Sequence, residues 1–349
     1  MNYYERSLDK WNKIRERDDF ILLAIESSCD ETAVAVYRGN ELLSNLISTQ
    51  IEIHKRFGGV VPEIASRNHI LAIDNLVKEA LSAASLSIKD VEIIAVTYGA
   101  GLLGALLVGV SYAKALAYAL DVPIMAIDHI KGHVFANFIE YKDITFPFLC
   151  LLASGGHTEI AEVKSYTDVN VLGQTTDDAA GEAFDKVARV LHLPYPGGPQ
   201  IEAKAKEGKD CIKMPRPFKG EKHLNFSYSG LKTAVINYVH NTEAKGGEIN
   251  PADVACSFQN AAVGMLVENA ITAAKKLGYK TIALAGGVGA NTALREKLTV
   301  EAKKRGIKVY LPAKKLCTDN AAMIGIAAYY AIKDGVKPSD LSLDADPNL

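Results

Sequence analysis

Phe20-Ile-Leu-Leu-Ala-Ile25 is followed by Glu26-Ser-Ser-Cys-Asp-Glu-Thr32 and then by Ala33-Val-Ala-Val-Tyr37. An apolar run, a short polar segment and a second apolar run predict a strand, a tight turn and a second strand. The same order returns later in the chain, where the apolar run Phe146–Leu152 leads into Ala153-Ser-Gly-Gly-His-Thr158 and then into Glu159–Val163. A recurrence of this kind indicates an internal duplication.

A glycine-rich loop continues the repeat in each half. Val91–Val96 is followed by three glycines between positions 99 and 104 and by a predicted helix that ends near Leu120. Lys280–Ala285 is followed by Gly286-Gly-Val-Gly-Ala-Asn291 and by a predicted helix that ends near Arg305. Backbone N–H groups in such loops, and the helix starts behind them, hold phosphate groups.

The repeat predicts an α/β fold of the duplicated actin-like ATPase (ASKHA) type, with two lobes around a nucleotide and metal cleft. One glycine turn between a strand and a helix is common in unrelated folds, but four loops in matching order are a far more specific signal. We expect a charged N-terminal arm at residues 1–19 and an N-terminal lobe at 20–135. A C-terminal lobe at 136–349 would carry a helical insert at about 165–275.

The composition is typical of a soluble protein. The 349 residues, 48% of them hydrophobic, suffice for two full-sized cores, and five scattered cysteines without a CxxC pair favour a reducing compartment. Ile93–Ala113 carries no charge and is long enough to span a bilayer, but its glycines divide it into a strand, a loop and a helix. Residues 1–19 lack the apolar core of a signal peptide. We therefore expect a cytoplasmic protein that does not enter a membrane.

His129 and His133 lie four residues apart, directly after the apolar run Val122–Ile127. On a helix both imidazoles project from one face and can bind one metal ion, although such a pair is by itself a weak signal. Asp319 follows a similar run, Ile307–Leu311, in the second half. Because we interpret the halves as copies, we expect Asp319 to face the histidines across a cleft. Two imidazoles and one carboxylate form an open site for zinc or ferrous iron.

Other polar features allow two interpretations each. Asp185 lies three residues after Glu182 on one helical face, and the two are either a solvated carboxylate pair or a binding site for ribose hydroxyls. Asn291 either caps the second glycine helix or contacts a nucleotide. His157 is either structural or polarises a phosphate. Residues 209–222 include five basic and two acidic side chains and form either a solvated loop or a contact for a phosphate backbone.

Several specific motifs lie between about residues 20 and 340. They are Glu26-Ser-Ser-Cys-Asp-Glu-Thr32, His54 through Gly58-Gly-Val-Val-Pro-Glu-Ile-Ala-Ser-Arg67, Gly104-Ala-Leu-Leu-Val-Gly109, the His129/His133 pair, Ser154-Gly-Gly-His157, Asp177-Asp-Ala-Ala-Gly-Glu-Ala-Phe-Asp185, Gly286-Gly-Val-Gly-Ala-Asn291 and Cys317-Thr-Asp-Asn-Ala-Ala322. In combination they resemble the universal tRNA threonylcarbamoyladenosine transferases, the tRNA N6-adenosine threonylcarbamoyltransferase family of the bacterial TsaD type.

The resemblance implies a metal-dependent acyltransferase. It would move threonylcarbamoyl from threonylcarbamoyl-adenylate to N6 of adenosine 37 in tRNAs reading ANN codons and release AMP. The resemblance also implies one Fe²⁺ or Zn²⁺ per subunit, bound by His129, His133 and Asp319, and a site that suits the adenylate, ATP, ADP or AMP. The residues implied for that site are Leu152, Ala153, Ser154, Gly155, Gly156, Asp185, Gly198, Glu202 and Asn291. The implied partners are tRNA, the TsaB and TsaE proteins and a separate synthase that supplies the donor.

The donor in such a reaction is an activated mixed anhydride, so the protein needs no covalent nucleophile. No residue stands out as a general base, and His157 and Asp185 are the catalytic candidates. The alternatives are an actin-fold kinase or ATPase, which has no need for the histidine pair, and a non-catalytic scaffold similar to TsaB, which needs no metal ligands. A zinc protease is disfavoured, because Ile130 stands where the HExxH motif has glutamate. The predicted apolar helices at 62–84 and 104–120 are our prediction for the surface that binds TsaB.

Overall fold

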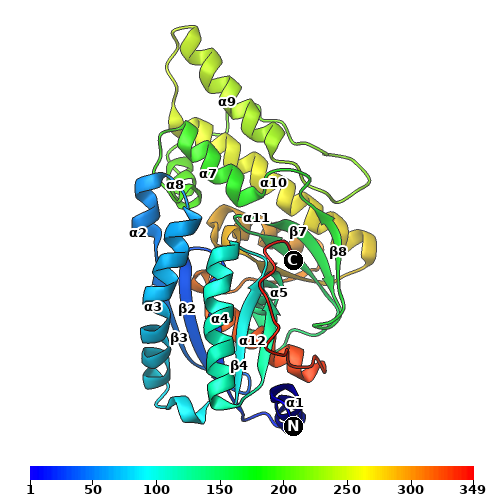
Figure 1. Cartoon of the computed structure of the whole chain (residues 1–349). Coiled ribbons are helices and arrows are strands. Elements are labelled where there is room, and N and C mark those ends of the chain that lie inside the picture. Colours follow the sequence, from blue (N-terminus) through cyan, green and yellow to red (C-terminus); the bar gives the residue numbers. More distant parts are fainter. The chain divides into compact units, whose positions relative to one another are not determined.

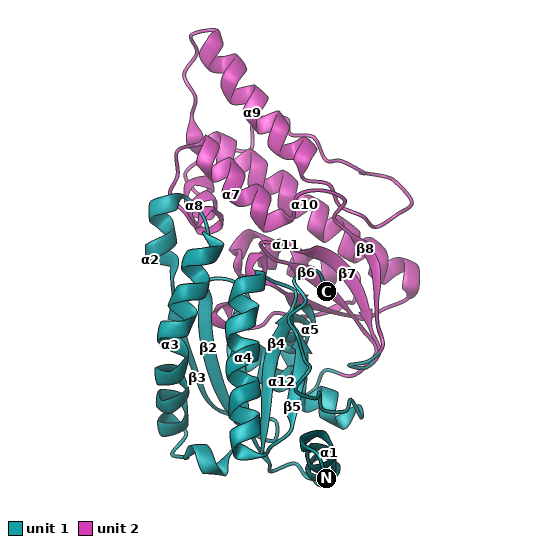
Figure 2. Ribbon diagram, viewed as in Figure 1, with its two compact units in different colours: residues 1–144, 165–167, 319–349 teal, residues 145–164, 168–318 magenta.

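The computed structural model describes residues 1–349 and divides into two compact units. Unit 1 comprises residues 1–144, 165–167 and 319–349, and unit 2 comprises residues 145–164 and 168–318 (Figure 2). Each unit contains one five-stranded mixed sheet together with the helices that pack against it (Figure 1).

The sheet of unit 1 has the strand order β3-β2-β1-β4-β5. Its strands are β1 (Ile21–Glu26), β2 (Glu31–Arg38), β3 (Glu41–Thr49), β4 (Ile93–Gly99) and β5 (Ile124–Asp128). β1, β2 and β3 pair antiparallel in sequence, whereas β4 pairs parallel with both β1 and β5. The carboxyl ends of β1, β4 and β5 therefore meet at one edge of the sheet, where ligand sites of α/β folds lie.

Helices cover both faces of this sheet. Leu23 and Ile25 of β1 point into a core shared with α3 and α4, and Ala24 between them lies close to α12. A Cβ on Gly325 of α12 would approach the ring of Tyr37 to 2.4 Å, so the helix can lie this close to β2 only without a side chain at that position. The helices of the unit are α1 (Tyr3–Ile14), α2 (Ile51–His54), η1 (Lys55–Phe57), α3 (Pro62–Ala83), η2 (Ile88–Asp90), α4 (Leu103–Leu120), α5 (His129–Phe135), α6 (Asn137–Glu140) and α12 (Ala321–Lys333).

The N-terminal segment, expected as a charged arm, forms α1 and packs against the α4–β5 connection within unit 1. Its start is a capping box, in which Asn2 and Glu5 satisfy each other's backbone N–H groups. Trp11 is 2% exposed, and the Tyr3 hydroxyl donates to the carbonyl of Val122. Asp121 accepts from both Arg6 and Lys10. A buried apolar face and these contacts hold the segment on the α4–β5 connection.

The apolar run that is long enough for a membrane span forms β4 and α4. α4 is the one helix in the chain with the length and hydropathy of a spanning segment. It packs against β4 and α3, and Ala105, Leu106, Val110, Ala113 and Ala117 are buried. The predicted strand, loop and helix are therefore what the structure contains.

Unit 2 repeats the topology of unit 1. Its strand order is β10-β9-β6-β7-β8, with β6 antiparallel to β7 and parallel to β9, as β1 is to β2 and β4. This correspondence confirms the predicted duplication. The strands are β6 (Phe148–Ala153), β7 (Thr158–Val163), β8 (Val169–Gln174), β9 (Thr281–Ala285) and β10 (Lys308–Tyr310). The helices are α7 (Ala180–Val190), α8 (Gly197–Ala205), α9 (Ser229–Ala244), α10 (Pro251–Leu277), η3 (Gly287–Ala290), α11 (Thr292–Lys303) and η4 (Lys314–Leu316).

Candidate metal centre and nucleotide pocket

The histidine pair lies on α5, which begins directly after β5. Asp128 is the N-cap of this helix, and its carboxylate accepts from the backbone N–H of Ile130 at 2.7 Å. His129 and His133 are one helical turn apart, and their ring centroids are separated by 4.7 Å. The cap and the buried strand before it thus determine where both imidazoles lie.

Asp319 comes from the segment that precedes α12. Gly132 of α5 lies against Ile324 and Met323, where an added Cβ would come within 2.9 Å of Ile324. This close packing brings the start of α12 next to α5. The sequence predicted that Asp319 would face the histidines from the opposite half; instead the residue belongs to unit 1, because α12 packs on the sheet of that unit.

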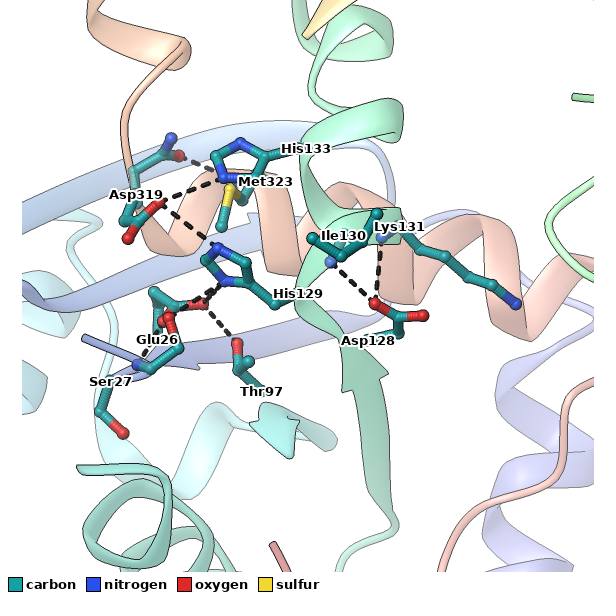
Figure 3. Close-up of polar contacts among 12 residues, drawn as sticks. Glu26, Ser27, Thr97, Asp128, His129, Ile130, Lys131, His133, Asp319 and Met323 are labelled. Carbon is teal, nitrogen blue, oxygen red and sulfur yellow. Dashed lines mark hydrogen bonds and ion pairs between the residues drawn. The ribbon is translucent and has the colours of Figure 1, made fainter. Parts of the chain in front are cut away.

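The three side chains converge on one point (Figure 3). Their ligand atoms all lie within 4.8 Å of one another. Oδ1 of Asp319 is 3.1 Å from Nε2 of His133 and 3.5 Å from Nε2 of His129. Both histidines are buried, and the side chain of Asp319 is 23% exposed. Two nitrogen donors and one oxygen donor that point inward from rigid elements suit a divalent transition metal with open coordination positions.

A buried glutamate stands behind His129. Glu26 is fully buried at the end of β1, and its Oε2 is 3.2 Å from Nδ1 of His129. The hydroxyl of Thr97 donates to the same carboxylate oxygen, and the backbone N–H of Ser28 donates to the other, each at 2.5 Å. Glu26 and Ser28 belong to a motif that was recognised in the sequence, but neither they nor Thr97 were assigned to the metal site; an acidic residue at the end of a wholly apolar strand was a usable signal.

The charges of this cluster shift the pKa values of its members. Burial alone would lower the pKa of His129, but the carboxylates of Asp319 and Glu26 raise it to about 9. Burial opposes ionisation of Asp319, and the two imidazoles nevertheless lower its pKa to about 2. Burial, together with the charges of Asp30 and Asp319, raises the pKa of the Glu31 carboxyl to about 9. Glu31 is therefore neutral at neutral pH, and it is the charges of Asp319 and Glu26 that make the surroundings of His129 anionic and favourable to a cation.

Unit 2 contains a cavity of about 190 Å³ beside the second glycine loop. Five of the predicted substrate residues line it, namely Gly155, Asp185, Gly198, Glu202 and Asn291. Residues that sequence analysis did not assign to the site complete the lining, namely Gly181, Phe184, Pro199, Gly287, Val288 and Ala290. Most of these additions fall inside the motifs already recognised, which was the available signal.

Hydrogen bonds fix the polar side chains around this pocket. Oδ1 of Asp185 accepts from the backbone N–H of Gly197 at 2.7 Å, which ties α7 to the start of α8. Glu202 accepts from the N–H of Thr292, at the first residue of α11. Asn291 caps α11 by accepting from Leu294 and also lines the pocket, so the two interpretations of this residue are compatible.

The other predicted residues support the pocket without lining it. Leu152 and Ala153 are buried at the end of β6, and Ser154 opens the tight turn that His157 closes. Gly156 lies within that turn. Gly286 has a φ of +84° and lies so close to Ala153 that a Cβ would come within 2.4 Å of its carbonyl oxygen. The two loops therefore approach each other through backbone alone.

Together, the repeated sheets, the cluster of three candidate metal ligands and the glycine-lined pocket define an α/β protein with the actin-like ATPase fold. Solved structures share this fold. Full-length HypF in a phosphate- and nucleotide-bound form superposes with a TM-score of 0.62 at 16% identity, over 92% of this chain and 47% of that one. The activator of 2-hydroxyisocaproyl-CoA dehydratase from Clostridium difficile, with bound ADPNP, gives a TM-score of 0.51 at 10% identity over 90% and 96% of the two chains.

The chain belongs to the tRNA N6-adenosine threonylcarbamoyltransferase (TsaD) family, whose model matches residues 41–326. A curated relative of that name from Clostridium perfringens is 57% identical over 334 residues, which cover 95% of this chain and 98% of the relative. Another from Clostridioides difficile is 55% identical over 333 residues, with the same coverage. The family predicted from the motifs is confirmed.

Proposed function

We propose that this chain moves the threonylcarbamoyl group from threonylcarbamoyl-adenylate to N6 of adenosine 37 in tRNAs reading ANN codons and releases AMP. The observation that carries the proposal is the convergence of His129, His133 and Asp319 within 4.8 Å in a chain of the threonylcarbamoyltransferase family. A kinase of the same fold has no use for this triad. A non-catalytic scaffold has no reason to keep three ligand atoms together.

We assign one Fe²⁺ or Zn²⁺ to these three residues. Two imidazole nitrogens and one carboxylate oxygen are the donor set of open sites for either ion, since three protein ligands leave positions for substrate oxygens. The orientation of the side chains fits this role, because Nε2 of both histidines faces the carboxylate of Asp319. When bound, the ion supplies Lewis-acid stabilisation of negative charge on the donor.

We assign the pocket of unit 2 to the adenylate. Backbone N–H groups of the loops at Gly155 and Gly287, with the start of α11 behind them, favour a phosphate. Asp185 and Glu202 line the same pocket, and carboxylate oxygens accept hydrogen bonds from ribose hydroxyls. Leu152, Ala153, Ser154 and Gly156 hold the loop that carries Gly155.

In the proposed reaction N6 of the adenine attacks the carbamoyl carbon, the bond from that carbon to the phosphate oxygen breaks, and AMP leaves with the electron pair. The side chains position the two reactants and stabilise charge, and no covalent intermediate forms on the protein. The proton on N6 leaves after attack. Asp185 lines the pocket and His157 lies in the turn beside it, and they remain the candidates for accepting this proton.

We further propose that the basic segment 209–222 contacts the tRNA backbone. Lys209, Lys213, Lys219 and Lys222 are exposed, and Arg216 is held by Glu268 at 2.7 Å. Replacing Lys213, Lys219 and Lys222 by glutamate should weaken tRNA binding and reduce its dependence on salt, because each lost phosphate contact releases one counterion fewer. Unchanged binding in a filter assay over a salt series would remove this segment from the interface.

The groove between α3 and α4 is the proposed surface for TsaB. It has a volume of about 490 Å³ and is lined by Ile70, Ile73, Asp74, Leu107, Val108, Ser111 and Tyr112. Ile70 in this lining is 62% exposed, and Leu71 beside the groove is 75% exposed. An exposed apolar strip on two helices fits an apolar helical partner. Leu71→Glu should abolish co-elution with TsaB, while Val300→Glu on α11, which is also exposed, should not.

The decisive experiment incubates tRNA with the chain, TsaB, TsaE, the donor synthase, threonine, bicarbonate and ATP, under the reducing conditions of the cytoplasm that we propose as its location. The tRNA is then digested to nucleosides, which are identified by mass spectrometry. The expected product is N6-threonylcarbamoyladenosine at position 37. His129→Ala combined with His133→Ala should remove both bound metal and product while the fold survives. Full activity of a metal-free double variant would refute the proposed site.

A further inference from the structure

The carboxylate of Glu26 is held rigidly at the end of β1. Both of its oxygens are engaged, Oε1 by the backbone N–H of Ser28 and Oε2 by the hydroxyl of Thr97. Glu26 and Thr97 are fully buried. A buried carboxylate that accepts from two fixed donors cannot rotate without leaving one of them unpaired, and an unpaired buried donor is costly.

The same carboxylate selects which nitrogen of His129 faces the cation site. Nδ1 of His129 is 3.2 Å from Oε2 of Glu26 and 3.1 Å from the hydroxyl of Ser28, and Nε2 is directed at Asp319 (Figure 3). An ionised carboxylate can only accept, so Nδ1 carries the hydrogen. The lone pair of a neutral imidazole then lies on Nε2, on the side of Asp319.

His133 has no such support. Its Nε2 also faces Asp319, but its Nδ1 is a buried nitrogen with no hydrogen-bond partner. On its Nδ1 side this ring is therefore held by packing alone, and only the contact with Asp319 orients its Nε2. The two histidines differ in the quality of their support, although their positions on α5 are alike.

We propose that Glu26 is a positioning residue for the metal site. Its carboxylate accepts the Nδ1–H of His129 and so keeps Nε2 of His129 directed at the ion as the main nitrogen ligand. This inference rests on the metal site proposed above. A carboxylate behind a histidine ligand fixes its tautomer and raises its basicity, and loss of such a partner weakens metal binding by about 10- to 100-fold. Thr97 acts one step further out, by orienting Glu26.

Metal affinity of the isolated chain tests the proposal without the reaction. The metal-free chain is titrated with Zn²⁺ against a chromophoric chelator at constant pH, for the wild type, Glu26→Gln and Glu26→Ala. Glutamine keeps an acceptor and loses the charge, so we expect weakening of about 10-fold for glutamine and about 100-fold for alanine. Ser44→Ala is the matched control, because it removes another buried hydrogen bond of unit 1, from Ser44 to Ala80, and should leave the affinity unchanged.

Cobalt spectroscopy separates positioning from a general loss of stability. With Co²⁺ in place of Zn²⁺, the visible bands should shift in Glu26→Gln because the basicity and angle of one ligand change, and they should remain unchanged in Ser44→Ala. If the Glu26 variants do not fold, as judged by circular dichroism, Thr97→Val decides. It should weaken Zn²⁺ binding several-fold, and wild-type affinity would overturn the proposal.

Single histidine variants distinguish failure of this inference from failure of the site itself. His129→Ala should cost more metal affinity than His133→Ala. If both bind Zn²⁺ as tightly as the wild type, the metal site is wrong. The other outcome is that both histidine variants lose the ion, whereas Glu26→Gln and Glu26→Ala bind Zn²⁺ with an affinity within about threefold of the wild type. In that case the metal site is correct and the proposed role of Glu26 is wrong.

Discussion

Asp319→Asn keeps the shape of the third ligand and removes its charge. Oδ1 of Asp319 lies 3.1 and 3.5 Å from Nε2 of His133 and of His129, so the carboxylate charge is close to both proposed ligand atoms. At a separation of about 4 Å and an effective dielectric constant of about 20, one carboxylate charge attracts each unit of an ion's charge by about 4 kcal/mol, which is about 8 kcal/mol for a divalent ion. Asparagine retains an oxygen donor and water offsets part of the lost attraction, so we expect about half of it to appear as a loss in affinity of about 1,000-fold.

The same variant should change the metal-free protein in a second, independent way. Asp319 is the main carboxylate that raises the pKa of His129 against the effect of burial. In Asp319→Asn the pKa of His129 should therefore fall from about 9 towards its ordinary value, which NMR titration of the metal-free chain measures. Asp334→Asn, in the same unit but bonded to Thr167, is the control and should change neither quantity.

Competition against a chelator gives the affinity, and thermal unfolding checks that the variant is folded. An Asp319→Asn chain that binds Zn²⁺ within tenfold of the wild type would show that Asp319 is not a ligand. An unchanged titration of His129 would show that the coupling between the two residues is wrong. The two measurements test different claims, because the Zn²⁺ affinity reports on binding of the ion and the pKa of His129 reports on binding of a proton.

Three further predictions concern pH, packing and the nucleotide. Since the pKa of metal-free His129 is raised to about 9, its protonated form stabilises the chain fully below about pH 6.5. In the presence of a chelator, the contribution of protonated His129 to the free energy of unfolding should disappear as the pH rises through 9. The affinity for Zn²⁺ should rise by up to about tenfold per pH unit over the same range, because the ion displaces the proton. Gly325→Ala should lower the free energy of unfolding by about 1–3 kcal/mol in urea titrations, since the new Cβ meets Tyr37. Asn291→Ala removes the cap of α11 and should lower the free energy of unfolding by about 1 kcal/mol. Asn291→Asp should keep the cap and should weaken the binding of AMP, as measured by calorimetry.

The fold was predictable because its signals are local and repeated. Apolar strands, polar turns and glycine loops occur twice in the same order, and both sheets have the same topology. The starts of two helices were also predictable, because aspartate and asparagine are common N-cap residues. Asp128 caps α5 and Asn291 caps α11. The helical character of residues 3–14 was less clear, because a charged segment can only be assigned to a packed helix once Tyr3 and Trp11 have a surface to cover.

The candidate site was predictable where its chemistry is carried by residue type. Two histidines at helical spacing directly after a buried strand favour a ligand pair, and glycine loops that recur in matching order favour a phosphate site. The residues that support His129 were not predictable from the sequence. Glu26 and Thr97 come from different strands, and they reach His129 only because β1, β4 and β5 pair in parallel register. Pairing of strands distant in sequence depends on the whole sheet, which no local pattern specifies.

The placement of Asp319 illustrates the same limit. The duplication made it reasonable to expect this residue on the second half of the molecule, opposite the histidines. α12 nevertheless packs on β1 and β2, where Gly325 permits contact with Tyr37 and the Tyr37 hydroxyl donates to the carbonyl of Ala322. His129, His133 and Asp319 then all belong to unit 1, so the packing of α5 and α12 on one sheet is enough to bring the three side chains together.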